Sequence, residues 1–179
     1  MNVVLLSTYE LGRQPFGLAS PAAWLRSRGH QVTTIDLAIS KPSLDGIRNA
    51  HLIAFFLPMH TATRLALPLI PRVRSLNAEA VICAYGLYAA LAEVRLRELG
   101  ITACFGGEFE AALSDFADTL TATSRVDVLE RLRFEKPDRS TLPVLSEYAK
   151  LVTGERKKTA GYTEASRGCK HTCRTVASA

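Results

Sequence analysis

The sequence predicts an α/β protein built around a doubly wound, five-stranded parallel sheet. Strand-like apolar runs alternate with helix-like segments over residues 1–120, which is the pattern of successive β/α units. The composition, 47% hydrophobic and 22% charged, is typical of a globular domain with a core. A chain of 179 residues has room for one such domain and part of another.

The five predicted strands are the apolar runs of the first two-thirds of the chain. They cover residues 2–7, 31–37, 52–57, 80–84 and 101–105. The first and third are almost wholly apolar, as strands buried on both faces are.

Helix signals lie between these strands. Ser20 and Pro21 predict a helix start, and Gly29 predicts its end. Pro68 and Pro71 interrupt the segment after the third strand, so we expect a helix in two pieces there. Further helices are expected over residues 43–49, 89–99 and 108–120.

Five β/α units without a long insertion indicate a flavodoxin-like, Rossmann-type domain. Ligands of such sheets bind beyond the carboxyl ends of the strands, near the switch in strand order. The loops at that edge supply the candidate binding residues, which are Thr8, Glu10, Gly12, Met59, His60, Thr61, Thr63, Tyr85, Gly86, Gly107 and Glu108.

The remainder of the chain changes character. An amphipathic helix is expected over residues 126–134, an extended crossing over 136–143 and a short helix over 146–151. Residues 153–159 resemble a polar linker, and residues 162–166 a short strand. The predicted organisation is therefore a domain over 1–120, a helical or extended linker over 121–160 and the start of a further domain over 161–179.

The distribution of charge and the cysteines bear on the expected partners and the cellular compartment. From residue 153 onward six Lys or Arg stand against two Glu, so most of the +5 net charge lies in this tail. A solvated basic linker explains that excess better than a nucleic-acid arm, and we expect no nucleic acid partner. No apolar run reaches membrane-spanning length, and the N-terminus lacks a secretory signal. Cys83 and Cys104 lie in apolar runs, as buried free thiols do, so we expect a cytoplasmic protein.

Cys169 and Cys173 form the cysteine pair with chemical meaning. Three residues separate them in a loop that follows Gly168, and four neighbouring Arg, Lys and His residues favour their thiolates. Their spacing allows both sulfurs to face one iron–sulfur cluster or metal ion. A zinc site with His171 would lack a fourth ligand nearby.

The run EASRGCKHTCR at residues 164–174 resembles the cluster loop of radical S-adenosylmethionine enzymes. In that family a Cys-x3-Cys-x2-Cys loop holds a 4Fe–4S cluster that cleaves S-adenosylmethionine to a 5′-deoxyadenosyl radical. The family's third cysteine would fall at position 176, where Val176 stands. We therefore expect a chain cut within the cluster loop, lacking the barrel and not catalytically competent by itself.

The order of parts is similar to radical S-adenosylmethionine proteins with an N-terminal cobalamin-binding domain. The turn GGEFE at residues 106–110 matches a Gly-Glu-x-Glu turn of those proteins. The resemblance implies that Thr61 and Thr63 approach the nucleotide tail of cobalamin, and that Gly86 lets the corrin ring approach. The Asp-x-His-x-x-Gly loop that supplies a cobalt ligand is absent, which implies histidine-free binding.

Two other readings stay open. One is a non-catalytic α/β binding or interaction protein without a cofactor. The other is a complete nucleotide-binding enzyme, although neither a Gly-x-Gly-x-x-Gly turn nor a phosphate-binding loop is present.

Overall fold

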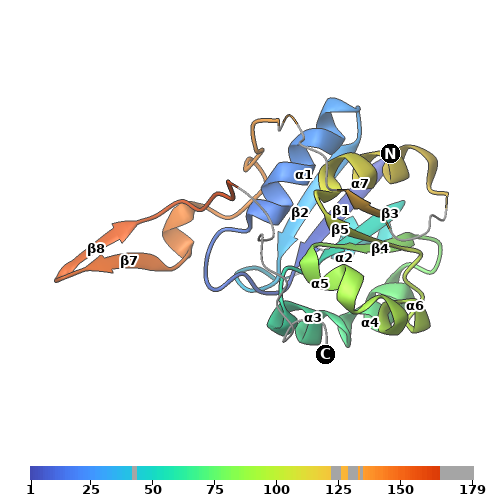
Figure 1. The fold of residues 1–179 in the computed structure, drawn as a ribbon, viewed down its shortest axis with the longest axis horizontal. Coiled ribbons are helices and arrows are strands. Elements are labelled where there is room, and N and C mark those ends of the chain that lie inside the picture. The colour runs from blue at the N-terminus through green and yellow to red at the C-terminus, as the bar shows by residue number, and fades with distance from the viewer. Residues whose placement is uncertain (42–43, 122–125, 129–132, 134, 166–179) are drawn as a thin grey trace.

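The computed structural model describes residues 1–41, 44–121, 126–128, 133 and 135–165, with the backbone alone at 126–128. Figure 1 shows a compact α/β body from which one hairpin projects. The strands of the body are β1 (Asn2–Ser7), β2 (Gln31–Asp36), β3 (Leu52–Phe56), β4 (Val81–Tyr85), β5 (Ala103–Gly107) and β6 (Val126–Val128). The helices are α1 (Phe16–Ser27), α2 (Leu44–Arg48), α3 (His60–Ala66), α4 (Leu69–Leu76), α5 (Leu87–Leu91), α6 (Glu93–Glu98) and α7 (Phe109–Thr119).

The sheet confirms the predicted fold class. Its strand order is β2-β1-β3-β4-β5-β6 and every neighbouring pair is parallel. The first five strands thus have the doubly wound, flavodoxin-like order, with the switch between β1 and β3. β3 is buried along its whole length, which explains its uninterrupted apolar sequence.

The sixth strand corrects the expected helix over residues 126–134. Residues Val126–Val128 pair in parallel with the end of β5, from Phe105 to Gly107. Two valines in three residues suit a strand, and β5 offered an unpaired edge. Pairing with the exposed backbone groups of this sheet edge therefore outweighed the helical spacing of the apolar residues.

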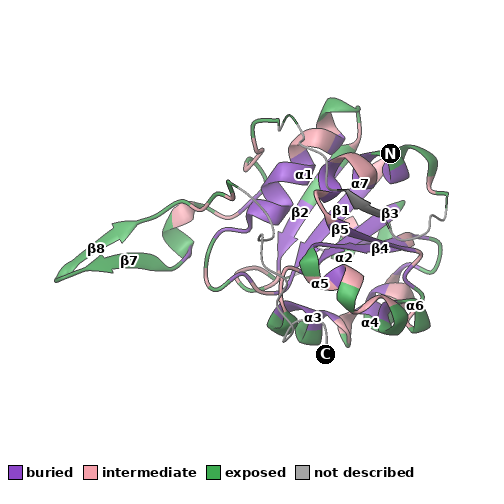
Figure 2. Ribbon diagram, in the orientation of Figure 1, coloured by how far each residue is buried: buried purple, intermediate pink, exposed green. Residues whose placement is uncertain are grey.

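Helices cover both faces of the sheet (Figure 2). α1 and α7 bury their apolar residues with one face, in a cluster that includes Leu18, Leu113 and Phe116. The helices α2 to α6 pack on the opposite face, with Ile70 and Leu96 among their buried residues. Two clusters on opposite faces are what the alternating crossovers of a doubly wound sheet produce.

Helix α1 begins earlier than the Ser20-Pro21 signal predicted. It starts at Phe16, so Pro21 lies inside the helix. Proline has no N–H to bond the carbonyl four residues earlier, which is that of Gly17. The Tyr85 hydroxyl donates to this carbonyl at 2.8 Å. A buried tyrosine therefore satisfies the group that Pro21 leaves unbonded, and this allows the helix to pass through a proline.

Two other helix predictions had different outcomes. The segment after β3 does form two helices, α3 and α4, with Pro68 between them, as predicted. The single helix expected over residues 89–99 instead begins at Leu87 and is divided into α5 and α6 at Ala92.

Residues 135–149 run back across the body as an extended segment. The Asp138 N–H donates to the Ala19 carbonyl, and its carboxylate pairs with Arg26. Further on, the Ala149 N–H donates to the carbonyl of Gly12 at 2.8 Å. This segment thus joins α1 to the loop that follows β1.

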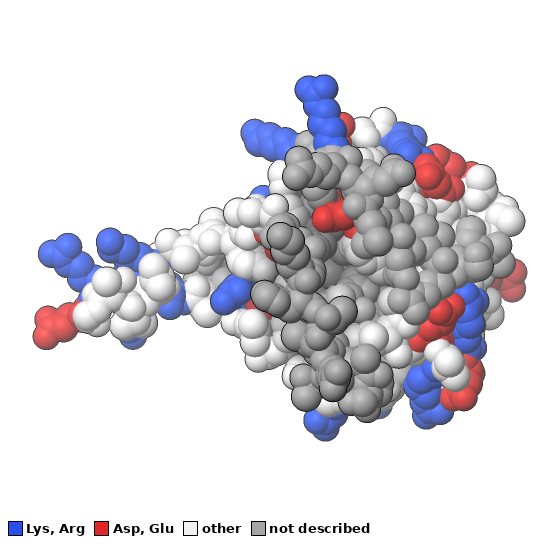
Figure 3. Space-filling view, in the orientation of Figure 1, with Lys and Arg blue, Asp and Glu red and all other residues white. Residues whose placement is uncertain are grey.

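The chain then projects as an antiparallel hairpin of β7 (Lys150–Thr153) and β8 (Arg156–Thr159). This corrects the linker expected over 153–159. The short helix expected over 146–151 is a 3₁₀ turn, Leu145–Glu147, followed by β7. All eight strand residues are exposed, and Lys and Arg side chains gather on the hairpin (Figures 2 and 3). Residues 161–165 form no strand, so within the described part of the expected strand 162–166 that prediction was wrong.

Candidate functional site

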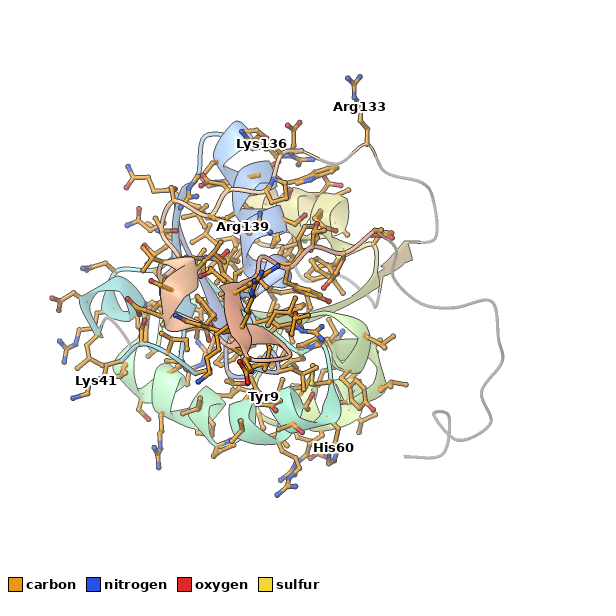
Figure 4. The ribbon with its side chains drawn as sticks, turned by 90° about the vertical axis from the view of Figure 1, so that its left-hand side faces the viewer. Tyr9, Lys41, His60, Arg133, Lys136 and Arg139 are labelled. Atoms are coloured by element: carbon orange, nitrogen blue, oxygen red, sulfur yellow. The ribbon has the colours of Figure 1, made fainter. Side chains whose placement is uncertain are left out.

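The carboxyl ends of the parallel strands meet at the edge from which the hairpin projects. Figure 4 looks onto this side and labels Tyr9, in the loop after β1, and His60, at the start of α3. The edge has two parts that differ in covering. We call the ends of β1 and β2, which residues 142–149 cover, the closed half. The ends of β3, β4 and β5 form the open half.

The open half presents a mixture of apolar and polar side chains. Met59 is half-buried, and His60 and Thr61 are exposed. The His60 ring meets Tyr88 of α5 edge-on, with centroids 6.4 Å apart. Leu87 is 54% exposed beside it at the start of α5. These residues form a surface that a flat, partly apolar ligand can contact.

Two predicted binding residues behind this surface belong to the core. Tyr85 is fully buried between Phe56 and Phe109, with ring centroids 5.3 and 4.8 Å away. The Thr63 hydroxyl donates to the Met59 carbonyl within its own helix. Both side chains are used internally, so neither is presented to a ligand.

The backbone conformation at position 86 explains why glycine stands there. Its φ is +107°, a conformation that side-chain-bearing residues rarely adopt. A Cβ here would lie 2.8 Å from the Leu57 carbonyl oxygen. The turn after β4 therefore requires glycine whether or not a cofactor approaches it.

The turn after β5 contributes Gly107 and Glu108, both half-exposed at the open half. The second acidic residue of the turn, Glu110, is fully buried. Its Oε1 accepts the Ser20 hydroxyl at 2.7 Å. The resemblance in this turn thus includes one residue at the edge and one that joins α7 to α1.

Thr8 lies at the switch in strand order. Its hydroxyl donates to the Ala62 carbonyl of α3 at 2.8 Å. The bond ties the loop after β1 to the helix after β3, across the position where ligands of such sheets bind. The Thr8 hydroxyl therefore serves to hold the two loops together.

The closed half contains the other two predicted residues, Glu10 and Gly12. Glu10 is 4% exposed, and its Oε2 has no hydrogen-bond partner among the described residues. Gly12 has φ +74°, and a Cβ there would lie 3.0 Å from the Ala149 Cβ. Gly12 is thus a position where the covering segment lies close against the loop.

Four polar residues that the sequence analysis did not select lie in the same half. They are Ser7, Gln14, Asp36 and Tyr148, and each is at least nine-tenths buried. Ser7 Oγ and Gln14 Oε1 have no hydrogen-bond partner within the described chain. The Tyr148 hydroxyl instead lies against the Asp36 carboxylate and hydrogen-bonds to it. Ser7 and Asp36 are the last residues of strands that end at the predicted ligand edge, and this position is the signal that could have identified them. No feature of the sequence pointed to Tyr148, because it reaches the closed half from a segment distant in the chain.

The carboxylates of the closed half have unusual acidities. Burial, together with the nearby Glu164, raises the pKa of Glu10 to about 7, although Arg13 partly offsets them. Burial also raises the pKa of Asp36, and the hydrogen bonds that its carboxylate accepts from the Ala38 N–H and the Tyr148 hydroxyl partly offset this. Burial and Asp36 in turn raise the pKa of Tyr148.

The cluster-loop residues Cys169 and Cys173 lie outside the described residues. Within the described residues no group of three or more His, Cys, Asp or Glu is arranged to hold a metal ion. No helix in the described ranges is long and apolar enough to cross a membrane.

Comparisons with known proteins add little to this geometry. No protein family and no curated protein matches the sequence. Among solved structures the chain is similar to an alpha-glucosyltransferase in complex with UDP-glucose and DNA containing an abasic site, at 12% identity and a TM-score of 0.41. The similarity covers 70% of this chain and 41% of that chain. So distant a likeness carries no argument about function.

Proposed function

We propose that this chain is the N-terminal, cobalamin-binding-type part of a radical S-adenosylmethionine protein, and that the open half is its cofactor surface. The observation that carries the proposal is the order of parts. A flavodoxin-like domain is followed by a crossing segment and then by the run SRGC at residues 166–169. The doubly wound fold is the one that the resemblance requires.

The accessible residues fit such a cofactor in part. Five of the eleven candidates are exposed or half-buried at the open half, and these are His60 and Thr61, which are exposed, and Met59, Gly107 and Glu108, which are half-buried. Leu87 and Tyr88 add apolar and aromatic surface against which a corrin ring would pack. Thr61 offers a hydroxyl group at its rim. Bound cobalamin would supply a methyl carrier, and a cluster held in part by Cys169 and Cys173 would supply the reductive chemistry.

His60 is the residue whose role the proposal restricts. It is exposed and rests against Tyr88. The resemblance implies binding without a histidine ligand, so His60 lines the surface and does not bind cobalt. The same proposal assigns the protein to the cytoplasm. A reducing compartment suits the free thiols Cys83 and Cys104, because burial raises the pKa of Cys83 and keeps it protonated.

An anaerobic titration of the full chain with hydroxocobalamin, read by absorbance and gel filtration, tests the proposal. We expect stoichiometric co-elution with a base-off spectrum that is unchanged in His60→Ala. Leu87→Glu should abolish co-elution, because it places a charge on the ring-binding surface.

Leu151→Glu is the matched control. Leu151 is as exposed as Leu87, at 56% against 54%, but lies on the hairpin. Binding should survive this change. No binding at tens of micromolar, or equal loss in both variants, would overturn the proposal.

A cofactor-free interaction protein is the second candidate function. It is favoured by the internal use of Tyr85, Thr63 and Gly86, which leaves fewer groups for a ligand than the resemblance implies. Failure of the titration would leave this candidate in place.

A further inference from the structure

We propose that the loop after β1, residues 8–14, is a joint that fixes the outgoing chain relative to the open half. Arg13 and Arg139 are its positioning residues, and they hold Tyr162. The inference rests on the proposed function, because it concerns how a cluster loop is placed with respect to a cofactor surface. None of these three residues was predicted as a site residue from the sequence.

Two arginines from different segments contact Tyr162. The Arg13 guanidinium, in the loop after β1, lies over the Tyr162 ring, 4.9 Å from its centroid. Arg139, in the extended segment 135–149, donates from Nη2 to the Tyr162 carbonyl at 2.7 Å. Figure 4 labels Arg139 on the side from which the hairpin projects. One arginine thus holds the side chain and the other holds the backbone, so both the position and the direction of the chain are fixed at this residue.

The segment that carries Tyr162 turns one side toward the body. Tyr162 and Glu164 are half-buried, whereas their immediate neighbours in the chain are exposed. Side chains of an extended chain alternate in this way when one side lies against a surface. Glu164 lies near enough to Glu10 of the loop to raise the pKa of that buried carboxyl group. The outgoing chain therefore meets the loop at two successive inward positions.

The loop is shaped by a turn whose two central residues are left-handed. The Arg13 N–H donates to the Glu10 carbonyl at 2.8 Å, and φ is +53° at Leu11 and +74° at Gly12. Leucine rarely adopts such a φ. Because Leu11 is 51% exposed, burial of its side chain offsets little of the strain. Strain of this kind persists where surrounding contacts fix the backbone, and it is concentrated at functional sites.

The contacts that fix this turn come from the extended segment 135–149. The Ala149 N–H donates to the Gly12 carbonyl at 2.8 Å, and Gln14 Nε2 donates to the Pro143 carbonyl at 2.9 Å. Ala149 and Tyr162 flank the projecting hairpin. The loop therefore anchors the chain on both sides of the hairpin.

The same loop is also tied to the open half. The Thr8 hydroxyl donates to the Ala62 carbonyl of α3 at 2.8 Å, and α3 begins at His60 on the proposed cofactor surface. In the sequence, Cys169 follows Tyr162 by seven residues. Seven residues span at most about 25 Å. Holding Tyr162 therefore limits how far the first predicted cluster ligand can lie from this loop.

Fluorine NMR of protein labelled with 3-fluorotyrosine tests the joint on the full chain without cobalamin. The chain has five tyrosines, and the Tyr162 resonance is the one that Tyr162→Phe removes. In the unchanged protein we expect this resonance to be broad and displaced by the guanidinium over the ring. Arg13→Gln and Arg139→Ala should each move it toward the shift of free tyrosine and narrow it, because the ring then moves freely.

Arg13→Lys and Arg156→Ala are the controls. Lysine keeps a cation for the ring, so it should restore most of the displacement that glutamine removes. Arg156 is exposed on the hairpin, six residues before Tyr162, and its loss should leave the resonance unchanged. Arg13 is exposed as well, so its variants test the contact without disturbing the core.

Thr8→Val tests the tie between the loop and the open half. Valine has the shape of threonine but no hydroxyl for the Ala62 carbonyl, so the loop should loosen and the Tyr162 line should narrow. Thr63→Val is the matched control, because Thr63 is equally buried, at 6% exposed, and its hydroxyl bonds within its own helix. It should leave the Tyr162 line unchanged.

Three results would overturn the joint. They are a Tyr162 resonance that already matches free tyrosine in the unchanged protein, an unchanged resonance in both arginine variants, and equal effects of Thr8→Val and Thr63→Val. The hydroxocobalamin titration has a separate readout. Its failure would overturn the proposed function and leave the Tyr162 resonance to decide the joint.

Discussion

The two halves of the carboxyl edge differ in where their polar groups are directed. In the open half, buried hydroxyl groups bond to backbone carbonyls, as Tyr85 does to Gly17 and Thr63 to Met59. In the closed half, Ser7 Oγ, Glu10 Oε2 and Gln14 Oε1 are buried without a hydrogen-bond partner among the described residues. The open half therefore has satisfied polar groups beneath an exposed surface, whereas the closed half keeps buried polar groups unsatisfied.

Gly86→Ala should show the largest effect, since it tests whether the open half rests on a rigid turn. The new Cβ would meet the Leu57 carbonyl oxygen at 2.8 Å, and φ is +107°. Strain and overpacking together should lower the free energy of unfolding by about 4 kcal/mol. Chemical denaturation would measure it.

Gly100→Ala is the control, because Gly100 has φ +85° with nothing within 4 Å of a Cβ. It should lose only the strain part, about 1–2 kcal/mol. Equal losses in the two variants would mean that the contact with Leu57 is unimportant.

Glu10→Gln tests the buried carboxyl group of the closed half through the pH dependence of stability. The pKa of Glu10 is about 7 in the folded chain against 4.5 in its unperturbed state. The folded state therefore keeps a proton that the unfolded state releases, so stability falls as pH rises from about 4.5 to above 7. The full loss is about 3 kcal/mol.

Glu10→Gln removes this titration, so its stability relative to the unchanged protein should rise over the same pH window. Denaturation at pH 5 and pH 8 without divalent metal would measure it. A constant difference between the two proteins would show that Glu10 is not the titrating group.

Tyr85→Phe sharpens the view that the open half uses its polar groups internally. The change leaves the Gly17 carbonyl without a donor, which should cost about 2 kcal/mol. In a Pro21→Ala background, residue 21 regains an N–H for that carbonyl, so the cost should fall below about 1 kcal/mol. A double-mutant cycle measures this coupling. Equal costs in both backgrounds would contradict the proposed compensation.

Gly12→Ala should show the smallest effect, and it tests how much the contact with Gly12 stabilises the covering segment 142–149. Its Cβ would lie 3.0 Å from Ala149, a neighbour that can shift. Gly29→Ala is the control, with a similar φ of +83° and open space. We expect about 1 kcal/mol of loss beyond the control, with faster hydrogen exchange at the Ala149 amide. Identical losses would mean that the cover does not depend on this contact.

The sequence predicted the body of the fold because its signals are local. Apolar runs such as residues 52–57 are buried on both faces, and this alone distinguishes a central parallel strand. Pro68 lies between α3 and α4, and Pro71 lies in the first turn of α4, where proline is tolerated. Prediction from the sequence was less successful after residue 120. Residues 126–128, whose apolar spacing predicted a helix, form strand β6, and the polar run 153–159 belongs to a hairpin. In both cases backbone pairing with another strand outweighed the local propensity.

By itself the sequence determined the five β/α units, the edge at which to look for ligands, and a cluster-loop resemblance that awaits its test. The tertiary structure decided which edge residues are available. It buried Tyr85 to satisfy a carbonyl freed by Pro21, and it brought Tyr148 over Asp36 from more than a hundred residues away. The physical reason is that burial and hydrogen-bond partners are properties of packed segments, and a linear pattern of residue types does not specify which segments pack together.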